Sequence, residues 1–172
     1  MTNATAPNII RFILLLVVQI AICNNINFFG YINPYIYIIF ILLFPINDNN
    51  NNNRLFILLL SFLLGILVDM FSDSGGVHAA ASVCLAYARP VMLKASFGML
   101  YEHQSLKFSN IDTGNLITYV TLGTVLHHLV LFSLEIFNIS GILLIFKKTL
   151  FSSIFTIILS VLIIILFSRK RK

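Results

Sequence analysis

Residues Gly65 to Pro90 read GILVDMFSDSGGVHAAASVCLAYARP, and this stretch decides the fold. It begins as the end of a long apolar run, turns over SDSGG at 72–76, and continues as an apolar run of small residues that closes at Arg89-Pro90. Two apolar runs joined by so short a turn predict a helical hairpin within a membrane. Asp69 and His78 flank the turn, and ionisable groups near lipid usually face a protein interior, a partner or a water-filled cavity.

The composition is that of an integral membrane protein. Of the 172 residues, 59% are hydrophobic and 10% are charged, whereas soluble domains are roughly 45–50% apolar and about 25% charged. No segment shows the alternating pattern of a membrane β-barrel strand, so the spans are expected to be helical. The predicted fold is an all-α integral membrane protein, a compact bundle of about six transmembrane helices.

The whole chain, 1–172, is expected to form one transmembrane domain. The predicted spans cover about 9–29, 34–46, 55–71, 76–93, 116–137 and 146–167, and the last is almost purely aliphatic. The Asn-rich segment 47–54 is expected to be a polar, disordered loop, and 168–172 a basic tail. Tyr31, Tyr35 and Tyr37 are expected to mark the headgroup level.

The basic residues indicate the orientation. Six spans with both termini in the cytoplasm place nine of the eleven Lys and Arg residues inside and leave only Lys147 and Lys148 outside. The turn at 72–76 then lies outside. The net charge of +5 is explained by residues that flank apolar runs and contact anionic lipid, so no nucleic-acid partner is expected.

The first apolar run and the cysteines suggest no processing or metal site. The run after Arg11 lacks a signal-peptidase pattern, and Ile22 before Cys23 is a poor lipoprotein context, so this run is interpreted as the first membrane helix. Cys23 and Cys84 are far apart in apolar sequence and are expected to be inert thiols. No cofactor and no metal site are expected.

Asp69 and His78 allow two interpretations. In the first they hydrogen-bond to each other or to backbone groups and lock the hairpin. In the second they offer polar contacts to the membrane-proximal segment of a partner. An Asp–His pair is also a general-base arrangement, but no nucleophile or metal-ligand cluster accompanies it, so no catalytic residue is assigned.

Two further groups carry candidate roles. His128 and Glu135 are two helical turns apart and share a face, which favours interhelical hydrogen bonding, with a proton or ion pathway as the alternative. His127 is expected to point elsewhere. Arg89, beside Pro90, is expected to snorkel to lipid phosphates at the cytoplasmic end of the fourth helix, with a cytoplasmic partner contact as the alternative.

The pattern G-I-L-V-D-M-F-S-x-x-x-G-V-H-A-A-A followed by A-Y-x-R-P resembles the signature of the bacterial rod shape-determining family MreD. The segment GYINPY at 30–35, the short span ending at Pro45 and the helix from His127 to Glu135 are similar to that family too, particularly to Bacteroidota-like members. The resemblance implies a six-helix fold similar to the substrate-binding subunits of energy-coupling-factor transporters. Asp69, Gly76, His78, Arg89 and Pro90 carry over as candidate structural or partner-contact positions.

The resemblance also implies a function. Proteins of this family are non-enzymatic inner-membrane subunits of the cell-elongation complex. They work with the bitopic protein MreC, the MreB filament, the glycan polymerase RodA and its penicillin-binding transpeptidase to control peptidoglycan synthesis and cell shape. The alternative suggested by the architecture is a small-ligand-binding subunit of a membrane transporter. An intramembrane enzyme is disfavoured because no nucleophile or metal set is apparent.

Overall fold

The computed structural model of the chain describes residues 5–26, 30, 32–45, 51–102 and 112–168. Within these ranges the ordered elements are helices and no strand occurs. Four helices contain windows long and apolar enough to cross a membrane, at Pro7–Asn25, Arg54–Ser72, Thr113–Ile136 and Ile142–Leu166. The expected all-α membrane architecture is confirmed at this level. Six crossings stay a prediction.

The elements follow one another along the chain as α-helices and short 3-10 turns. In order they are α1 (Thr5–Ala21), η1 (Cys23–Asn25), α2 (Ile38–Leu42), α3 (Asn51–Ser72), α4 (Val77–Phe97), α5 (Met99–Glu102), α6 (Thr113–Ile136), η3 (Ile139–Gly141) and α7 (Ile142–Ser168).

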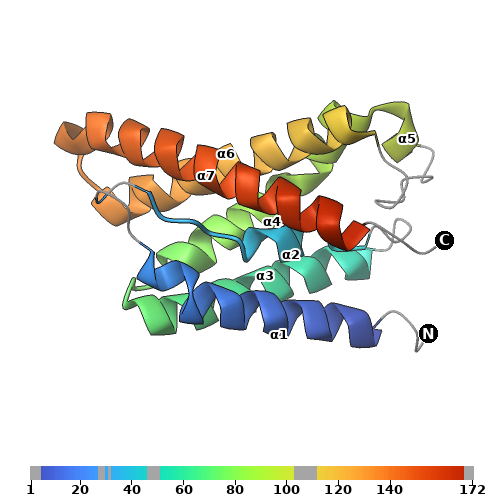
Figure 1. Cartoon of the computed structure of the whole chain (residues 1–172), viewed down its shortest axis with the longest axis horizontal. Helices are drawn as coiled ribbons and strands as arrows, with labels where there is room; N and C mark the ends of the chain where they lie inside the picture. Colours follow the sequence, from blue (N-terminus) through green and yellow to red (C-terminus); the bar gives the residue numbers. More distant parts are fainter. Residues whose placement is uncertain (1–4, 27–29, 31, 46–50, 103–111, 169–172) are drawn as a thin grey trace.

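Helix α4 is the centre of the bundle. It packs against α3 on one side and α6 on the other, while α1 covers α3 and α7 covers α6. The start of α1 and the end of α7 lie at the same end of the molecule (Figure 1). Such a central helix must be narrow, and α4 is accordingly built with small residues such as Ala79, Ala81 and Ala86, which are almost fully buried.

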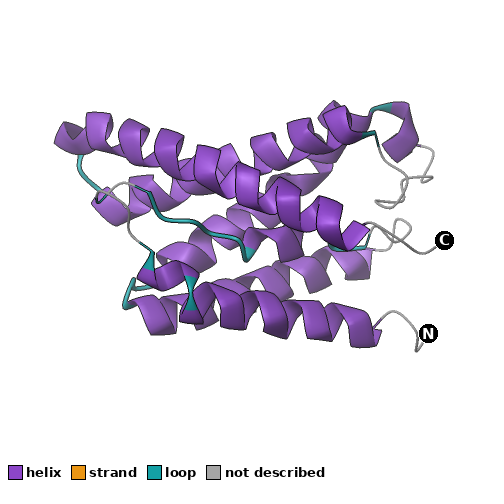
Figure 2. Cartoon of the chain, viewed as in Figure 1, coloured by secondary structure: helices purple, strands orange, loops and turns teal. Residues whose placement is uncertain are grey.

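The second predicted span differs from the expectation. Residues 34–46 were expected to form a short membrane helix, but only Ile38–Leu42 is helical. The chain before it runs as a loop into the middle of the bundle (Figure 2). From Tyr35 to Leu42 every residue is buried, so we call residues 32–44 the buried segment. The N–H groups of Asn33 and Tyr35 donate to the side-chain hydroxyls of Ser152 and Thr156, so the chain on both sides of Pro34 bonds to a neighbouring helix and not within a helix of its own.

Other predicted boundaries also shift. The helix α4 does not close at Arg89-Pro90 but continues to Phe97 with Pro90 inside it. Residues 51–54 of the expected polar loop belong to α3, because an Asn-rich first turn can be carried by a long apolar helix; residues 46–50 lie outside the described ranges. The first span is helical only to Ala21 and continues as the short turn η1. The spans at 55–71, 116–137 and 146–167 match α3, α6 and α7 closely.

Candidate functional site

The hairpin between α3 and α4 is closed by Asp69. One carboxylate oxygen accepts hydrogen bonds from the Ser74 hydroxyl at 2.5 Å and the His78 backbone N–H at 3.0 Å. The other accepts from the Ala79 N–H at 2.9 Å. Asp69 therefore caps the first turn of α4, where the positive end of the helix dipole favours a negative charge. Its carboxylate bonds to the backbone of His78 and leaves the imidazole free to point inward, which matches the first interpretation of this pair for Asp69.

Glycines set the shape of this hairpin. Gly75 and Gly76 adopt positive φ values of 66° and 95° in the turn, a conformation that glycine accepts at little cost. Gly65 serves a different purpose, because a Cβ there would lie 2.6 Å from the Ala79 nitrogen and 2.7 Å from the His78 carbonyl oxygen. The two helix backbones thus touch at Gly65, and no larger residue fits between them.

The imidazole of His78 points into the bundle and meets the buried segment. Its Nδ1 lies 3.0 Å from the hydroxyl oxygen of Tyr37, and the same hydroxyl lies 2.8 Å from Nε2 of His127. The hydroxyl carries one proton, so at most one imidazole nitrogen accepts from it and the other donates to it. His127 and Tyr37 are fully buried. A single phenol thus ties the buried segment to α4 and α6 together.

Tyr35 occupies the space between the imidazoles. Its ring centroid lies 5.1 Å from that of His78 and 5.3 Å from that of His128, in edge-to-face geometry. Tyr35 and Tyr37 are therefore core residues, and their expected position at the headgroup level is wrong; Tyr31 lies outside the described residues. The neighbouring Asn and Pro residues are typical of a membrane–water interface, whereas the side chains of Tyr35 and Tyr37 pack in the interior of the bundle.

His128 joins α6 to α7. Its Nδ1 lies 2.8 Å from the Thr124 carbonyl oxygen, which can only accept, so Nδ1 carries a proton. In the neutral imidazole Nε2 is then an acceptor for the Thr156 hydroxyl, 3.2 Å away. This is the interhelical hydrogen bond predicted for His128. Glu135 makes a separate contact with α7, an ion pair of 2.8 Å with Lys148 near the end of the bundle.

Helix α7 satisfies the backbone of the buried segment. Ser152 Oγ accepts from the Asn33 N–H at 3.1 Å, and Thr156 Oγ1 accepts from the Tyr35 N–H at 3.2 Å. Within a membrane, non-helical backbone needs such partners, because lipid cannot replace them. These two hydroxyls belong to a stripe of buried Ser and Thr side chains on one face of α7: Thr149, Ser152, Ser153, Thr156 and Ser160.

Arg89 holds the other end of the buried segment. Its guanidinium donates to the carbonyl oxygens of Leu42, at 3.3 Å, and Phe44, and to the Tyr119 hydroxyl at 3.1 Å. Tyr119 itself donates to the Leu42 oxygen at 2.9 Å. Arg89 is buried, so the expectation that it snorkels to lipid phosphates is wrong. The carbonyls that end the short helix α2 are acceptors without intrahelical donors, and the guanidinium satisfies them.

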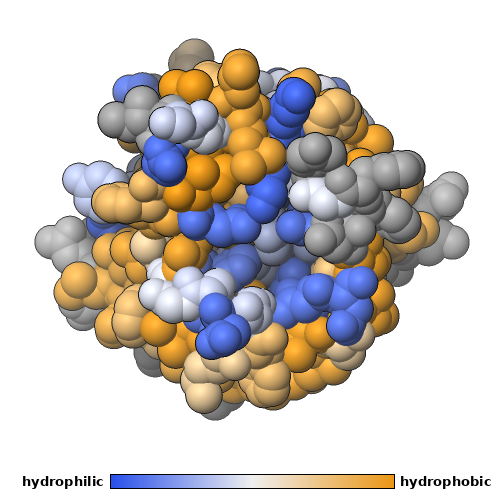
Figure 3. Space-filling model, turned by 90° about the vertical axis from the view of Figure 1, so that its left-hand side faces the viewer, coloured by the Kyte–Doolittle hydropathy of each residue, from blue (hydrophilic) through white to orange (hydrophobic). Residues whose placement is uncertain are grey.

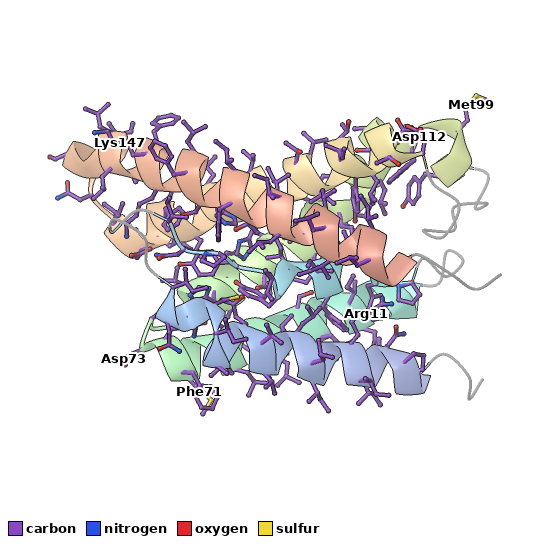
Figure 4. The ribbon with its side chains drawn as sticks, in the orientation of Figure 1. Arg11, Phe71, Asp73, Met99, Asp112 and Lys147 are labelled. Atoms are coloured by element: carbon purple, nitrogen blue, oxygen red, sulfur yellow. The ribbon has the colours of Figure 1, made fainter. Side chains whose placement is uncertain are left out.

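A polar recess opens above this cluster. Figure 3 shows hydrophilic side chains gathered in a hollow at the end of the bundle that carries Asp73 and Lys147, both labelled in Figure 4. At this end Gln19 donates to Asn24 at 2.9 Å and to the Pro34 carbonyl at 3.2 Å, and Asn24 donates to Ser72 at 2.9 Å.

The interior of the bundle keeps unused polar capacity. Among the described side chains, nine buried polar atoms have no hydrogen-bond partner, and Gln19 Oε1, His127 Nδ1 and Thr149 Oγ1 are three of them. No group of three or more His, Cys, Asp or Glu side chains within the described ranges is placed to hold a metal ion. The contacts within this cluster are hydrogen bonds and edge-to-face ring packing.

The structure thus brings together only some of the candidate residues that the sequence predicted. His78 and His128 meet around Tyr35, while Asp69 and Gly76 shape the hairpin above them. Arg89, Pro90 and Glu135 lie elsewhere. The residues that sequence reasoning missed are Tyr35, Tyr37, His127 and the α7 hydroxyl stripe. A signal for the stripe exists, because Ser and Thr recur at helical spacing within an otherwise aliphatic run.

Comparisons with known proteins add no relatives. No family model matches the sequence, and neither the curated proteins nor the solved structures give a significant match.

Proposed function

We propose that the chain is a non-enzymatic subunit of the rod, or elongation, complex in the bacterial cytoplasmic membrane, with both termini in the cytoplasm. In this proposal it acts as a membrane scaffold of the MreD type. It associates with an MreC-like bitopic protein, a RodA-like polymerase with its penicillin-binding transpeptidase, and the MreB filament. Through them it helps to control peptidoglycan synthesis and cell shape.

The proposal rests on the structural roles of the residues in the Gly65–Pro90 block. Asp69 caps α4, Gly65 lets α3 and α4 touch, and Arg89 holds the end of the buried segment. The polar residues that define the resemblance are thus engaged in building a rigid bundle. A sequence signature made of such residues suits a protein that presents surfaces to partners better than one that reacts with a substrate.

The test is co-purification from native membranes. We expect the tagged wild-type protein, solubilised in mild detergent, to recover the MreC-like and RodA-like proteins, and a tagged unrelated polytopic protein to recover neither. His78→Ala is not a useful docking variant, because its imidazole is buried against Tyr37. Recovery of the wild type alone, with cells that stay rod-shaped when it is depleted, would overturn the proposal.

The polar recess favours a second candidate, a small-ligand-binding subunit of a membrane transporter. Its support is the hollow in Figure 3 together with the buried polar atoms that lack a hydrogen-bond partner within the described part of the bundle. Such a subunit would co-purify with an ATPase module and retain a small molecule that native mass spectrometry detects. Thr149→Val, which removes a buried hydroxyl without a partner in the bundle, would then lower ligand retention without lowering expression.

A further inference from the structure

An arginine and a tyrosine form an exposed pair on the outer surface of the α3–α4 hairpin. Arg54 lies in the first turn of α3 and Tyr87 in α4, and the guanidinium carbon is 5.2 Å from the centroid of the Tyr87 ring. Tyr87 is 62% exposed, and Arg54 is exposed as well. Such a cation–π contact fixes the place of a long side chain that otherwise samples many rotamers.

The guanidinium of Arg54 has hydrogen-bond donors to spare. Within the described part of the chain, no carboxylate, carbonyl or hydroxyl oxygen accepts a hydrogen bond from it. Stacking on a ring uses the flat face of a guanidinium and leaves the five N–H groups in its plane available. The other two arginines in the described ranges differ, because Arg11 donates to the Leu43 carbonyl and Arg89 to the Leu42 carbonyl. Arg54 is therefore the described arginine that can receive a ligand.

The guanidinium lies beside lipid and does not extend into water. Arg54 is the first residue of Arg54–Ser72, a stretch long and apolar enough to cross a membrane. A backbone contact between Gly65 and Ala79 aligns α3 with α4. Residue 54 then lies opposite residue 90, so Tyr87 is about one helical turn further into the span. The Tyr87 ring thus holds the cation at the edge of the hydrocarbon, where a charge without a counter-ion is costly.

The surface next to the pair is apolar. Val91 follows Tyr87 by four residues on the same face of α4 and is 73% exposed. Leu58 follows Arg54 by four residues on the same face of α3 and is half-buried. A soluble anion gains nothing from such a surface, whereas the acyl chains of a phospholipid can cover it. The arrangement therefore favours a lipid over a free anion.

The charges at this end of the bundle also favour an anion. The starts of α1 and α3 and the end of α4 lie at one end of the molecule (Figure 1). The basic side chains of these segments are Arg11, Arg54, Arg89 and Lys94. Among the described side chains the acid at this end is Asp112, which is engaged in capping α6, whereas Asp69, Asp73 and Glu135 lie at the opposite end. A positive potential of this kind attracts a negatively charged headgroup.

We propose that Arg54 and Tyr87 form a site that retains one anionic phospholipid. The phosphodiester accepts paired hydrogen bonds from the Arg54 guanidinium, whose geometry matches two phosphate oxygens. The acyl chains lie along α3 and α4 beside Leu58 and Val91. Because the ring holds the guanidinium in place beforehand, little side-chain freedom is lost on binding. The inference goes beyond the proposed function and holds equally for a scaffold and for a transporter subunit.

Native mass spectrometry of the purified, delipidated full-length protein tests the site. Phosphatidylglycerol and phosphatidylcholine with identical acyl chains are the two probes. We expect one phosphatidylglycerol to bind per chain, about tenfold more tightly than phosphatidylcholine, whose ammonium group offsets the phosphate charge. Arg54→Gln should remove this tenfold preference. Tyr87→Leu should weaken phosphatidylglycerol binding roughly threefold through loss of the ring, and Tyr87→Phe should retain it. Lys147→Gln, which removes an exposed cation at the opposite end, is the matched control and should bind as wild type does.

Three results would overturn the proposal. The first is phosphatidylglycerol binding by Arg54→Gln that equals wild type. The second is an equal loss in Lys147→Gln, which would show attraction by net charge without a site. The third is displacement of the lipid by an equal concentration of inorganic phosphate or glycerol phosphate, which would make the ligand a soluble phosphate. Circular dichroism checks that the variants fold, and Tyr87→Leu carries the test if Arg54→Gln does not.

Discussion

The hydroxyl of Tyr37 lies 3.0 Å from Nδ1 of His78, which joins a non-helical segment in the bundle interior to the first turn of its central helix. His78 belongs to the Gly65–Pro90 block, and Tyr37 lies 41 positions earlier in the chain. This contact, the His127 contact of the same hydroxyl and the hydroxyls of α7 hold in place the part of the buried segment that precedes the short helix α2.

Tyr37→Phe should destabilise the bundle by about 1–3 kcal/mol, because it leaves two buried imidazole nitrogens without their partner. The midpoint of thermal unfolding in detergent measures the effect. Tyr87→Phe removes a hydroxyl from an exposed ring and is the matched control, with no change expected. Equal midpoints for the two variants would show that the Tyr37 hydroxyl does not stabilise the core.

Asp69→Asn should destabilise the hairpin by about 1–2 kcal/mol, because the neutral amide offers one acceptor oxygen where the carboxylate offers two and loses the favourable charge at the α4 N-terminus. Hydrogen exchange of the first turn of α4 should accelerate. Asp73→Asn, at an exposed turn residue, is the control and should leave that exchange unchanged. Protection that is equal in both variants would contradict the capping role.

Gly65→Ala should prevent normal assembly of α3 and α4, because the added carbon meets the backbone of Ala79, which cannot move aside. We expect little folded protein by size-exclusion chromatography in detergent. At Gly123 an added carbon meets the end of the Leu42 side chain, at 2.6 Å, which can change rotamer. Gly123→Ala should therefore fold with a modest loss of stability. If Gly123→Ala yields less folded protein than Gly65→Ala, the backbone contact at Gly65 is refuted.

Arg89→Lys should destabilise the protein by about 2–4 kcal/mol, since a lysine cannot reproduce the fork that binds the Leu42 and Phe44 carbonyls and the Tyr119 hydroxyl. Thermal unfolding again provides the measure. Arg54→Lys changes an exposed arginine that lies over the Tyr87 ring and should have little effect. If Arg89→Lys is as stable as wild type, the guanidinium does not hold the end of α2.

Labelling of single cysteines tests the proposed orientation, after the native Cys23 and Cys84 are replaced by serine. A membrane-impermeant maleimide should label Asp73→Cys in cells whose outer membrane has been made permeable. It should label Asp112→Cys, at the opposite end of the bundle, only after the inner membrane is opened. Both positions are exposed. The reverse pattern would invert the topology, and labelling of both in intact spheroplasts would exclude six crossings.

Much of the architecture could be predicted from composition and local pattern. The segments that form α3, α6 and α7 are long and predominantly apolar, and lipid leaves them no alternative to a helix. The turn between Asp69 and His78 carries glycines that allow positive φ, so the hairpin was predictable too. The small residues of the fourth span are typical of a helix that packs closely against its neighbours, and α4 is such a helix.

The candidate site depended on contacts between distant residues. Tyr35 and Tyr37 have neighbours typical of a membrane interface, and only the packing of α4, α6 and α7 around them places them in the core. Arg89 lies at a helix position suited to snorkelling. Its guanidinium instead points into the bundle, where it donates to the carbonyl oxygens of Leu42 and Phe44, more than forty residues earlier in the chain.

The sequence by itself determined that the chain is a helical membrane protein with a tight central hairpin, because hydrophobicity and turn chemistry are local properties. Only the tertiary structure decided that residues 32–44 form a buried segment with one short helix. Its backbone donors and acceptors are satisfied by side chains from α1, α4, α6 and α7, and no local pattern contains those partners. The positions of these polar side chains follow from the backbone N–H and C=O groups of the buried segment, which have no other hydrogen-bond partner in lipid.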